Sequence, residues 1–222
     1  MTSWTFDDIP DQTGRSAMVT GANSGIGFET ARALARKGAR VTLACRSLDR
    51  GMAAKERILA ETPDAEVDVA PLDLADLTRV ATFAEQVARA HDRLDLLVLN
   101  AGVMVPPASR TAQGFELQFG VNHLGHFALT GRLLPLLQST AGSRVVVVSS
   151  TAAAFGAMRF DDLHFEKRGY APWPAYGQSK LANQLFTREL QRRLRDAGST
   201  VQVTAAHPGW TATNLQRTSG AA

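Results

Sequence analysis

Short, almost continuously apolar runs alternate along the chain with longer segments of helical periodicity. The apolar runs cover residues 16–20, 40–45, 66–70, 94–99, 144–149 and 201–206. Runs of this kind are typical of strands buried on both faces, as in a parallel sheet. The helical segments lie near residues 25–37, 49–61, 76–91, 113–138 and 176–197. Strand alternating with helix predicts a doubly wound α/β fold, with a mostly parallel sheet and helices on both faces.

Composition narrows the class of protein without naming a function. The chain has 222 residues, of which 45% are hydrophobic and 20% charged, and no repeat or linker divides it, so we expect one domain over residues 1–222. The net charge is +3 with both signs interspersed, which does not indicate nucleic-acid binding. A single cysteine, no signal-peptide pattern and no apolar run long enough to span a bilayer favour a cytoplasmic protein without a membrane span.

A glycine-rich turn follows the first predicted strand. The sequence "TGANSGIG" at residues 20–27 contains Gly21, Gly25 and Gly27 between a strand and a helix. Glycine permits close backbone approach to a ligand, and the amides at the start of the helix can bind a pyrophosphate. We therefore expect the turn to hold a dinucleotide; its candidate contacts are Gly21, Asn23, Ser24, Gly25, Ile26 and Gly27. The alternative is a purely structural turn, since the spacing differs from GxGxxG.

Arginine follows the second strand, where an NAD-specific site usually has a carboxylate for the ribose 2′-hydroxyl. The residues at this point are Cys45 and Arg46. A guanidinium can pair with a 2′-phosphate instead, so the sequence favours NADP(H) over NAD(H). The alternative is a solvated surface arginine.

Small and polar residues follow the third, fourth and sixth strands, and in this fold class ligands bind at the carboxyl ends of strands. Asp73 and Leu74 are candidates for contact with the adenine, although Asp73 or Asp76 can equally cap the next helix. The other candidate cofactor contacts, each of which also reads as an ordinary turn, are Asn100, Ala101, Gly102, Pro208, Gly209, Thr211 and Thr213.

Tyr176 and Lys180 are four residues apart and so share one face of a helix, while Ser150 follows the fifth strand. A free tyrosine, with a pKa of about 10, is a poor base at neutral pH. A neighbouring ammonium and the positive charge of an oxidised nicotinamide both favour the tyrosinate, so we expect Lys180 and the bound cofactor together to lower the pKa of Tyr176 toward the working range. His123 and His126 have a spacing that can bind metal, but no carboxylate or cysteine cluster accompanies them. We therefore predict no metal site and expect packing or capping roles.

Taken together, these segments resemble the short-chain dehydrogenase/reductase superfamily. The ordered set is TGxxxGxG at 20–27, NAG at 100–102, Ser150, YxxxK at 176–180 and PGxxxT at 208–213. The resemblance implies a Rossmann-type fold and catalytic roles for Asn122, Ser150, Tyr176 and Lys180. Tyr176 would be the acid/base, Lys180 would also hold the nicotinamide ribose, and Asn122 would support a proton relay.

Finer features resemble the retinol-dehydrogenase-like and WW-domain-oxidoreductase-like branch. These are "ACR" after the second strand, "NHLGHFALT" at 122–130 and "FDDLHFE" at 160–166. That branch implies NADP(H), and we expect an apolar alcohol, aldehyde or ketone as substrate. Resemblance to the wider family implies pairing through the helices near 113–138 and 176–197 into a homodimer or homotetramer.

The chain departs from the family pattern at its end. It stops at Ala222, nine residues after Thr213, where family members continue with a substrate-covering segment and a seventh strand. We therefore expect the seventh strand and one wall of the substrate pocket to be missing. Two alternatives to an active dehydrogenase stay open: a protein that binds the cofactor without catalysis, as a sensor or scaffold, and a related double-bond reductase.

Overall fold

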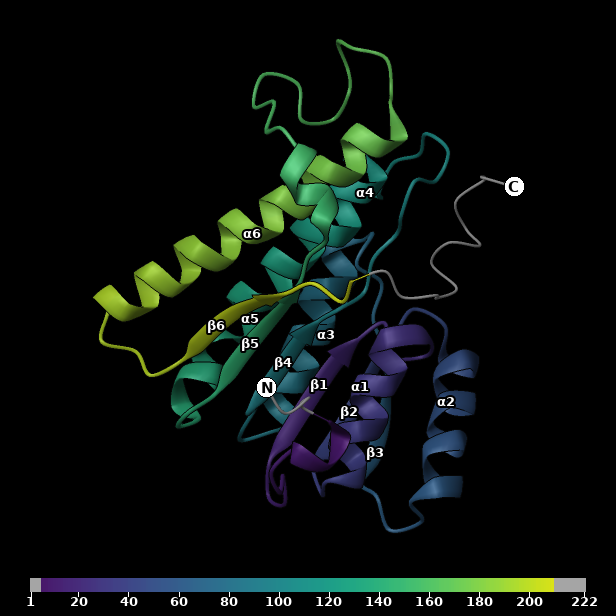
Figure 1. Ribbon diagram of the computed structural model, residues 1–222, viewed down its shortest axis with the longest axis vertical. Coiled ribbons are helices and arrows are strands. Elements are labelled where there is room, and N and C mark those ends of the chain that lie inside the picture. The colour runs from purple at the N-terminus through teal and green to yellow at the C-terminus, as the bar shows by residue number, and fades with distance from the viewer. Residues whose placement is uncertain (1–4, 210–222) are drawn as a thin grey trace.

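The sheet confirms the predicted doubly wound architecture. The computed structural model describes residues 5–209, and these contain six strands in the order β3-β2-β1-β4-β5-β6 (Figure 1). All neighbouring strands are parallel. The strands are β1 (Ser16–Thr20), β2 (Arg40–Cys45), β3 (Val67–Pro71), β4 (Leu96–Leu99), β5 (Arg144–Val148) and β6 (Gln202–Ala206). The order reverses between β1 and β4, so a ligand site is expected at the carboxyl ends of these two strands.

Helices follow the strands as the periodicity predicts, with differences at two starts. They are α1 (Gly25–Arg36), α2 (Leu48–Glu61), α3 (Leu77–Ala90), α4 (Leu117–Phe119), α5 (Gly125–Ser139) and α6 (Pro172–Asp196). A π-helical turn, η2 (Gly120–Leu124), joins α4 to α5, and η1 (Phe6–Asp8) and η3 (Thr151–Phe155) are 3-10 helices.

The predicted helix at 113–138 starts too early. Gly114 has a φ of 83°, which ends helical geometry there, and Glu116 caps α4 by accepting the amides of Gln118 and Phe119 at 2.7 Å each. In contrast, α6 begins four residues before the predicted start at 176, with Pro172 at its first position. A proline is tolerated there because the first helical amides have no partner within the helix.

The core explains why the strands are apolar at nearly every position. Successive side chains of a strand point to opposite faces of the sheet. In β1, Met18 packs in a cluster with α3 and α5, whereas Ala17 and Val19 pack in a second cluster with α1 and α2. Figure 1 shows these helix pairs on opposite faces of the sheet. Each strand position therefore removes apolar surface from water on one face or the other.

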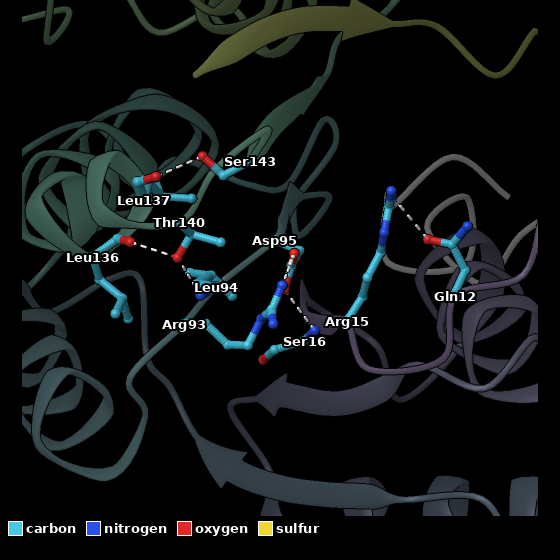
Figure 2. A network of polar contacts seen from close by, with 10 residues as sticks. All are labelled: Gln12, Arg15, Ser16, Arg93, Leu94, Asp95, Leu136, Leu137, Thr140 and Ser143. Atoms are coloured by element: carbon cyan, nitrogen blue, oxygen red, sulfur yellow. Dashed lines mark hydrogen bonds and ion pairs between the residues drawn. The ribbon is translucent and has the colours of Figure 1, made fainter. Parts of the chain in front are cut away.

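A polar network ties the amino-terminal edge of the sheet, opposite the ligand edge (Figure 2). The buried carboxylate of Asp95 accepts the Ser16 amide at 2.9 Å and two hydrogen bonds from the Arg93 guanidinium at 2.9 and 2.8 Å. Thr140, at the end of α5, accepts the Leu94 amide at 3.0 Å. These bonds align the starts of β1 and β4, which fixes the register of the two strands that position the site.

Candidate active site

A cleft of about 510 Å³ opens at the carboxyl ends of the strands. Its volume falls in the ordinary range of ligand pockets. The predicted site residues that line it are Gly21, Asn23, Ser24, Gly25, Ile26, Gly27, Arg46, Asp73, Leu74, Asn100, Ala101, Gly102, Ser150, Tyr176, Lys180, Pro208 and Gly209. Thr211 and Thr213 lie outside the residues that the structure describes. The topology therefore brings together residues that are far apart in sequence.

The glycine turn forms one end of the cleft and is packed too tightly for side chains. Gly21 has a φ of 67°, and a Cβ there would lie 2.9 Å from Cα of Ala101. A Cβ on Gly27 would overlap the Asn100 amide and lie 2.5 Å from the Gly21 carbonyl oxygen. The turn is therefore wedged against the segment after β4, which leaves the backbone at the start of α1 facing the cleft.

Two arginines border a cavity of about 240 Å³ beside the glycine turn. Arg46, after β2, and Arg50, in the first turn of α2, line it together with Asn23 and Ser47. Both arginines also line the main cleft. Within residues 5–209 neither guanidinium is ion-paired with a carboxylate. The pair leaves uncompensated positive charge at the end of β2, a setting suited to a phosphate.

The segments after β3 and β4 approach the cleft as predicted, and one of the open alternatives is resolved. Asp76 caps α3 by accepting the Thr78 amide at 2.9 Å, whereas Asp73 accepts the Ala75 amide at 2.9 Å and lines the cleft. The side-chain amide of Asn100 donates to the Thr20 carbonyl at 2.8 Å. Asn100 thus serves to join the ends of β1 and β4.

Tyr176, Lys180 and Ser150 meet at the other end of the cleft. Tyr176 is 5% exposed and shares a side-chain hydrogen bond with Ser150. The Lys180 amino group lies 5.7 Å from the centre of the Tyr176 ring and donates to the Val148 carbonyl at 3.1 Å. The Ser150 hydroxyl also accepts the Ala152 amide at 3.2 Å, so Ser150 both caps η3 and faces the tyrosine.

Burial changes the protonation behaviour of this group. It raises the pKa of Tyr176, and the hydrogen bond from Ser150 offsets part of that rise by favouring the tyrosinate. It also lowers the pKa of Lys180 to about 8. The sequence predicts a lowered tyrosine pKa from the ammonium and an oxidised nicotinamide acting together; in the protein without cofactor the pKa of Tyr176 is raised instead. The reason is desolvation, which the spacing of Tyr176 and Lys180 does not reveal.

Asn122 lies behind the cleft rather than on its wall. It is fully buried in η2; its side-chain oxygen accepts the Val103 amide at 2.8 Å, and its amide donates to the Ser179 hydroxyl and the Val103 carbonyl at 3.0 Å each. A Cβ on Gly102 would lie 3.1 Å from the Asn122 oxygen and 3.7 Å from the Lys180 amino group. Asn122 therefore positions the segment after β4 beside Lys180.

Apolar side chains form part of the cleft wall. Those of Met104, Leu117, Val121, Phe155 and Trp173 line the cleft. The Trp173 ring meets the Tyr176 ring edge-on, with centroids 6.2 Å apart. From the sequence, Phe155, Met158, Trp173 and Trp210 are interpreted as pocket or packing residues; of these Met158 is not on the wall, and Trp210 lies outside the described residues.

The two histidines have separate protein partners. The Nδ1 atom of His123 lies 3.2 Å from the Asn183 side-chain oxygen, and His126 contacts Thr20 and Asn122. Among the described residues, no three His, Cys, Asp or Glu side chains are grouped as a metal site requires. In the same part of the chain, no helix has both the length and the apolar character to cross a lipid bilayer.

Several wall residues were not identified from the sequence. Arg50 lies four residues after Arg46, in the first turn of α2. The predicted start of a helix at residue 49 was the signal that could have placed Arg50 beside the cleft. Val103, Met104, Pro106 and His207 also line the cleft. They belong to irregular segments without a periodic pattern, so sequence spacing gives no indication of where their side chains lie.

Comparisons with known proteins agree with the geometry. The profile of the short chain dehydrogenase family matches residues 15–162. The chain is 50% identical to retinol dehydrogenase 12 of Mus musculus over 206 residues, which cover 93% of this chain and 64% of the relative. It is 48% identical to human retinol dehydrogenase 13 over 207 residues, covering 93% of this chain and 62% of the relative. The chain thus spans less than two thirds of the length of these relatives.

Solved structures share the fold. An uncharacterized protein from Mycobacterium paratuberculosis is 49% identical, with a TM-score of 0.86 over 98% of this chain and 76% of that one. Pseudomonas aeruginosa RhlG, solved with NADP in its active site, is 28% identical, with a TM-score of 0.75 over 93% of this chain and 77% of that one.

Proposed function

We propose that this chain, which belongs to the short chain dehydrogenase family, transfers a hydride between NADP(H) and an apolar alcohol, aldehyde or ketone. The observation that carries the proposal is one cleft with two chemically distinct ends. At one end a glycine turn and two arginines face the cleft, and at the other Tyr176, Ser150 and Lys180 meet. The similarity to retinol dehydrogenases supports an alcohol or its carbonyl partner as the substrate.

The residues of the first end fit a nicotinamide dinucleotide. Gly25, Ile26 and Gly27 at the start of α1 line the cleft, and because the first amides of a helix have no partner within the helix, they suit a pyrophosphate. Arg46 and Arg50 suit the 2′-phosphate that distinguishes NADP(H) from NAD(H), and the residue after β2 is not an acid that would favour NAD(H). Pro208, Gly209, Thr211 and Thr213 remain candidate contacts on the nicotinamide side.

At the tyrosine end of the cleft, protein groups donate and accept the proton, while the nicotinamide, when bound, supplies or accepts the hydride. Tyr176 donates its phenolic proton to the substrate oxygen in reduction and recovers it in oxidation. The Ser150 hydroxyl donates a hydrogen bond to the same oxygen and stabilises its developing charge. Burial favours the phenol form of Tyr176, which is the form that reduction requires. With an oxidised nicotinamide bound, its positive charge and the Lys180 ammonium would favour the tyrosinate that oxidation requires, and Asn122 holds the segment beside Lys180.

The apolar wall supports an apolar substrate. Met104, Leu117, Val121, Phe155 and Trp173 offer no charged group to bind a polar substrate beyond the reacting oxygen. Removing hydrocarbon surface from water against this wall contributes roughly 25 cal/mol per Å². Affinity is therefore expected to rise with the length of the hydrocarbon portion.

The outer faces of α5 and α6 support a homodimer or homotetramer. Phe127 is 54% exposed and Leu185 44% exposed, and the Phe127 ring lies 5.4 Å from the Phe186 ring. Aromatic surface of this kind gains free energy when a second copy covers it. A cytoplasmic location is part of the same proposal, because the single cysteine, Cys45, is a buried free thiol that suits a reducing compartment.

The test is turnover by the purified chain with a panel of substrates. NADP⁺ with primary and secondary apolar alcohols, and NADPH with aldehydes, ketones and an activated double bond, separate the dehydrogenase from the double-bond reductase. We expect exchange between alcohol and carbonyl substrates only, with Tyr176→Phe slowing it by at least about a hundredfold while NADPH still binds. NADPH binding without turnover of any substrate would instead identify a non-catalytic cofactor-binding protein.

A further inference from the structure

His126 joins the two ends of the site, and the chemistry proposed above does not use it. It is the second residue of α5 and only 1% exposed. Its Nε2 atom lies 2.9 Å from the Thr20 hydroxyl, and its Nδ1 atom lies 3.0 Å from the backbone carbonyl oxygen of Asn122. One imidazole therefore contacts Thr20, the last residue of β1 and the first of the glycine-rich segment, and Asn122 behind the cleft.

The partners determine the tautomer of this ring. A carbonyl oxygen can only accept, so Nδ1 carries the proton and donates to Asn122. Nε2 is then the acceptor, and the Thr20 hydroxyl donates to it; the other acceptor near that hydroxyl, the Val98 carbonyl, is farther away at 3.4 Å. Burial lowers the pKa of His126 to about 4, and nearby Lys180 acts in the same direction. The imidazole is therefore neutral at physiological pH.

On the Thr20 side, the link reaches the segment after β4. The Thr20 hydroxyl oxygen accepts the backbone amides of Asn100 at 2.9 Å and Ala101 at 3.0 Å. Because that oxygen accepts two bonds, its single proton is the group that remains for His126. The segment after β4, against which Gly21 is wedged, is thereby fixed to α5.

On the Asn122 side, the link reaches α6, the helix that carries Tyr176 and Lys180. Asn122 lies in η2, where a π-helical turn interrupts the regular α-helical hydrogen bonding, so the orientation of its peptide depends on additional contacts. The bond from His126 supplies one such contact. The Asn122 side chain in turn holds Val103 and Ser179, and Ser179 immediately precedes Lys180.

We propose that His126 is a positioning residue that sets the Asn122 peptide relative to the segment after β4 and so couples cofactor binding to catalysis. The inference rests on the proposed function. Histidine suits the role because, in one fixed tautomer, it donates at one nitrogen and accepts at the other. Asparagine and glutamine each reproduce one of these two contacts, which makes the proposal testable in its parts.

The two contacts of His126 predict effects on different kinetic constants. His126→Asn retains a donor near the Nδ1 position; we expect kcat within about threefold of wild type and a KM for NADP⁺ raised about tenfold, as loss of the Thr20 contact loosens the turn. His126→Gln retains an acceptor near Nε2; we expect kcat reduced about tenfold and KM within about threefold. The matched control is Thr130→Val, which removes a buried bond to the His126 carbonyl at 2.8 Å on the same helix. It should change Tm without moving either constant.

Equal changes of kcat and KM in both variants, or changes of Tm alone, would overturn the proposal. These are the results expected if His126 has only a structural role. If neither variant folds, nitrogen-15 NMR of the wild-type imidazoles decides the matter. The proposal requires a neutral ring protonated at Nδ1 between about pH 6 and 8, and an Nε2-protonated or charged ring contradicts it. If the wild-type chain shows no turnover, the proposed function fails but the proposal about His126 remains testable. The tautomer of the wild-type His126 ring and the Kd of His126→Asn for NADPH then test it.

Discussion

The arginine pair after β2 gives the sharpest quantitative prediction. Arg46→Gln and Arg50→Gln each remove one guanidinium from the wall of the cavity beside the glycine turn and keep a polar side chain there. A hydrogen bond to a charged group contributes about 1.5–3 kcal/mol, and exposure to solvent reduces this contribution. Both arginines are exposed, so the low end applies: about 1.4 kcal/mol, or tenfold in Kd for NADPH, for each substitution.

The assay is fluorescence titration of NADPH and NADH at low and moderate salt. NADH lacks the 2′-phosphate, so its Kd should change by no more than about twofold in either variant. If the two arginines act independently, the double variant should lose about a hundredfold of the preference for NADPH over NADH. Higher salt should narrow the difference between wild type and variants. Lys55→Gln, which removes a cation of α2 outside both cavities, is the matched control.

Two outcomes would refute the reasoning about Arg46 and Arg50. Equal losses for NADPH and NADH would mean that the substitutions disturb the whole turn rather than a phosphate contact. Unchanged affinity for NADPH would mean that the arginines are merely solvated surface groups. Arg46→Asp extends the test, because its carboxylate can accept from the ribose 2′-hydroxyl and should shift preference toward NAD(H).

Two further predictions concern the scaffold. Gly27→Ala should weaken NADPH binding at least about tenfold, because the new Cβ overlaps the Asn100 amide. Its control is Gly131→Ala, on an open face of α5, which should instead stabilise the fold by about 0.5–1 kcal/mol, as denaturant unfolding can measure. Asp95→Asn should lower the free energy of unfolding by about 1.5–3 kcal/mol at pH 7. Burial raises the pKa of Asp95, but the bonds from Arg93 and the Ser16 amide outweigh burial and hold the pKa below its usual value. The stabilisation by the Asp95 carboxylate is therefore present above about pH 4 and is lost as the pH falls through the native pKa. A difference in unfolding free energy between wild type and Asp95→Asn that stays constant down to about pH 2 would contradict this.

Much of the fold follows from local pattern, and the differences have local causes. The strands were predicted within two residues because side chains on both faces of the sheet are buried, which leaves an unmistakable apolar run. The start of the helix at 113 was wrong because Gly114 and the Glu116 cap follow from turn geometry rather than periodicity. The proline start of α6 was missed for the same reason.

The site was predictable where it depends on strand ends and not where it depends on packing. Parallel strands bring their carboxyl ends to one edge, so the candidate residues after each strand were assigned to one cleft, and those that lie within residues 5–209 line it. The direction of the Tyr176 pKa depends on burial by surrounding segments, which no spacing reveals. Likewise, the sequence leaves His126 as a packing or capping residue, and only the structure gives it partners on two different elements.

The central claim is hydride transfer at the tyrosine end of the cleft, and transfer of an isotopic label measures it most directly. The chain is incubated with NADP⁺ and apolar alcohols that carry deuterium on the reacting carbon, and the nicotinamide is analysed by mass spectrometry. We predict deuterium on the nicotinamide with the wild-type chain and at least about a hundredfold slower labelling with Tyr176→Phe at an unchanged Kd for NADPH. Unlabelled nicotinamide across the panel while NADPH binds, or equal labelling by Tyr176→Phe, would contradict the account.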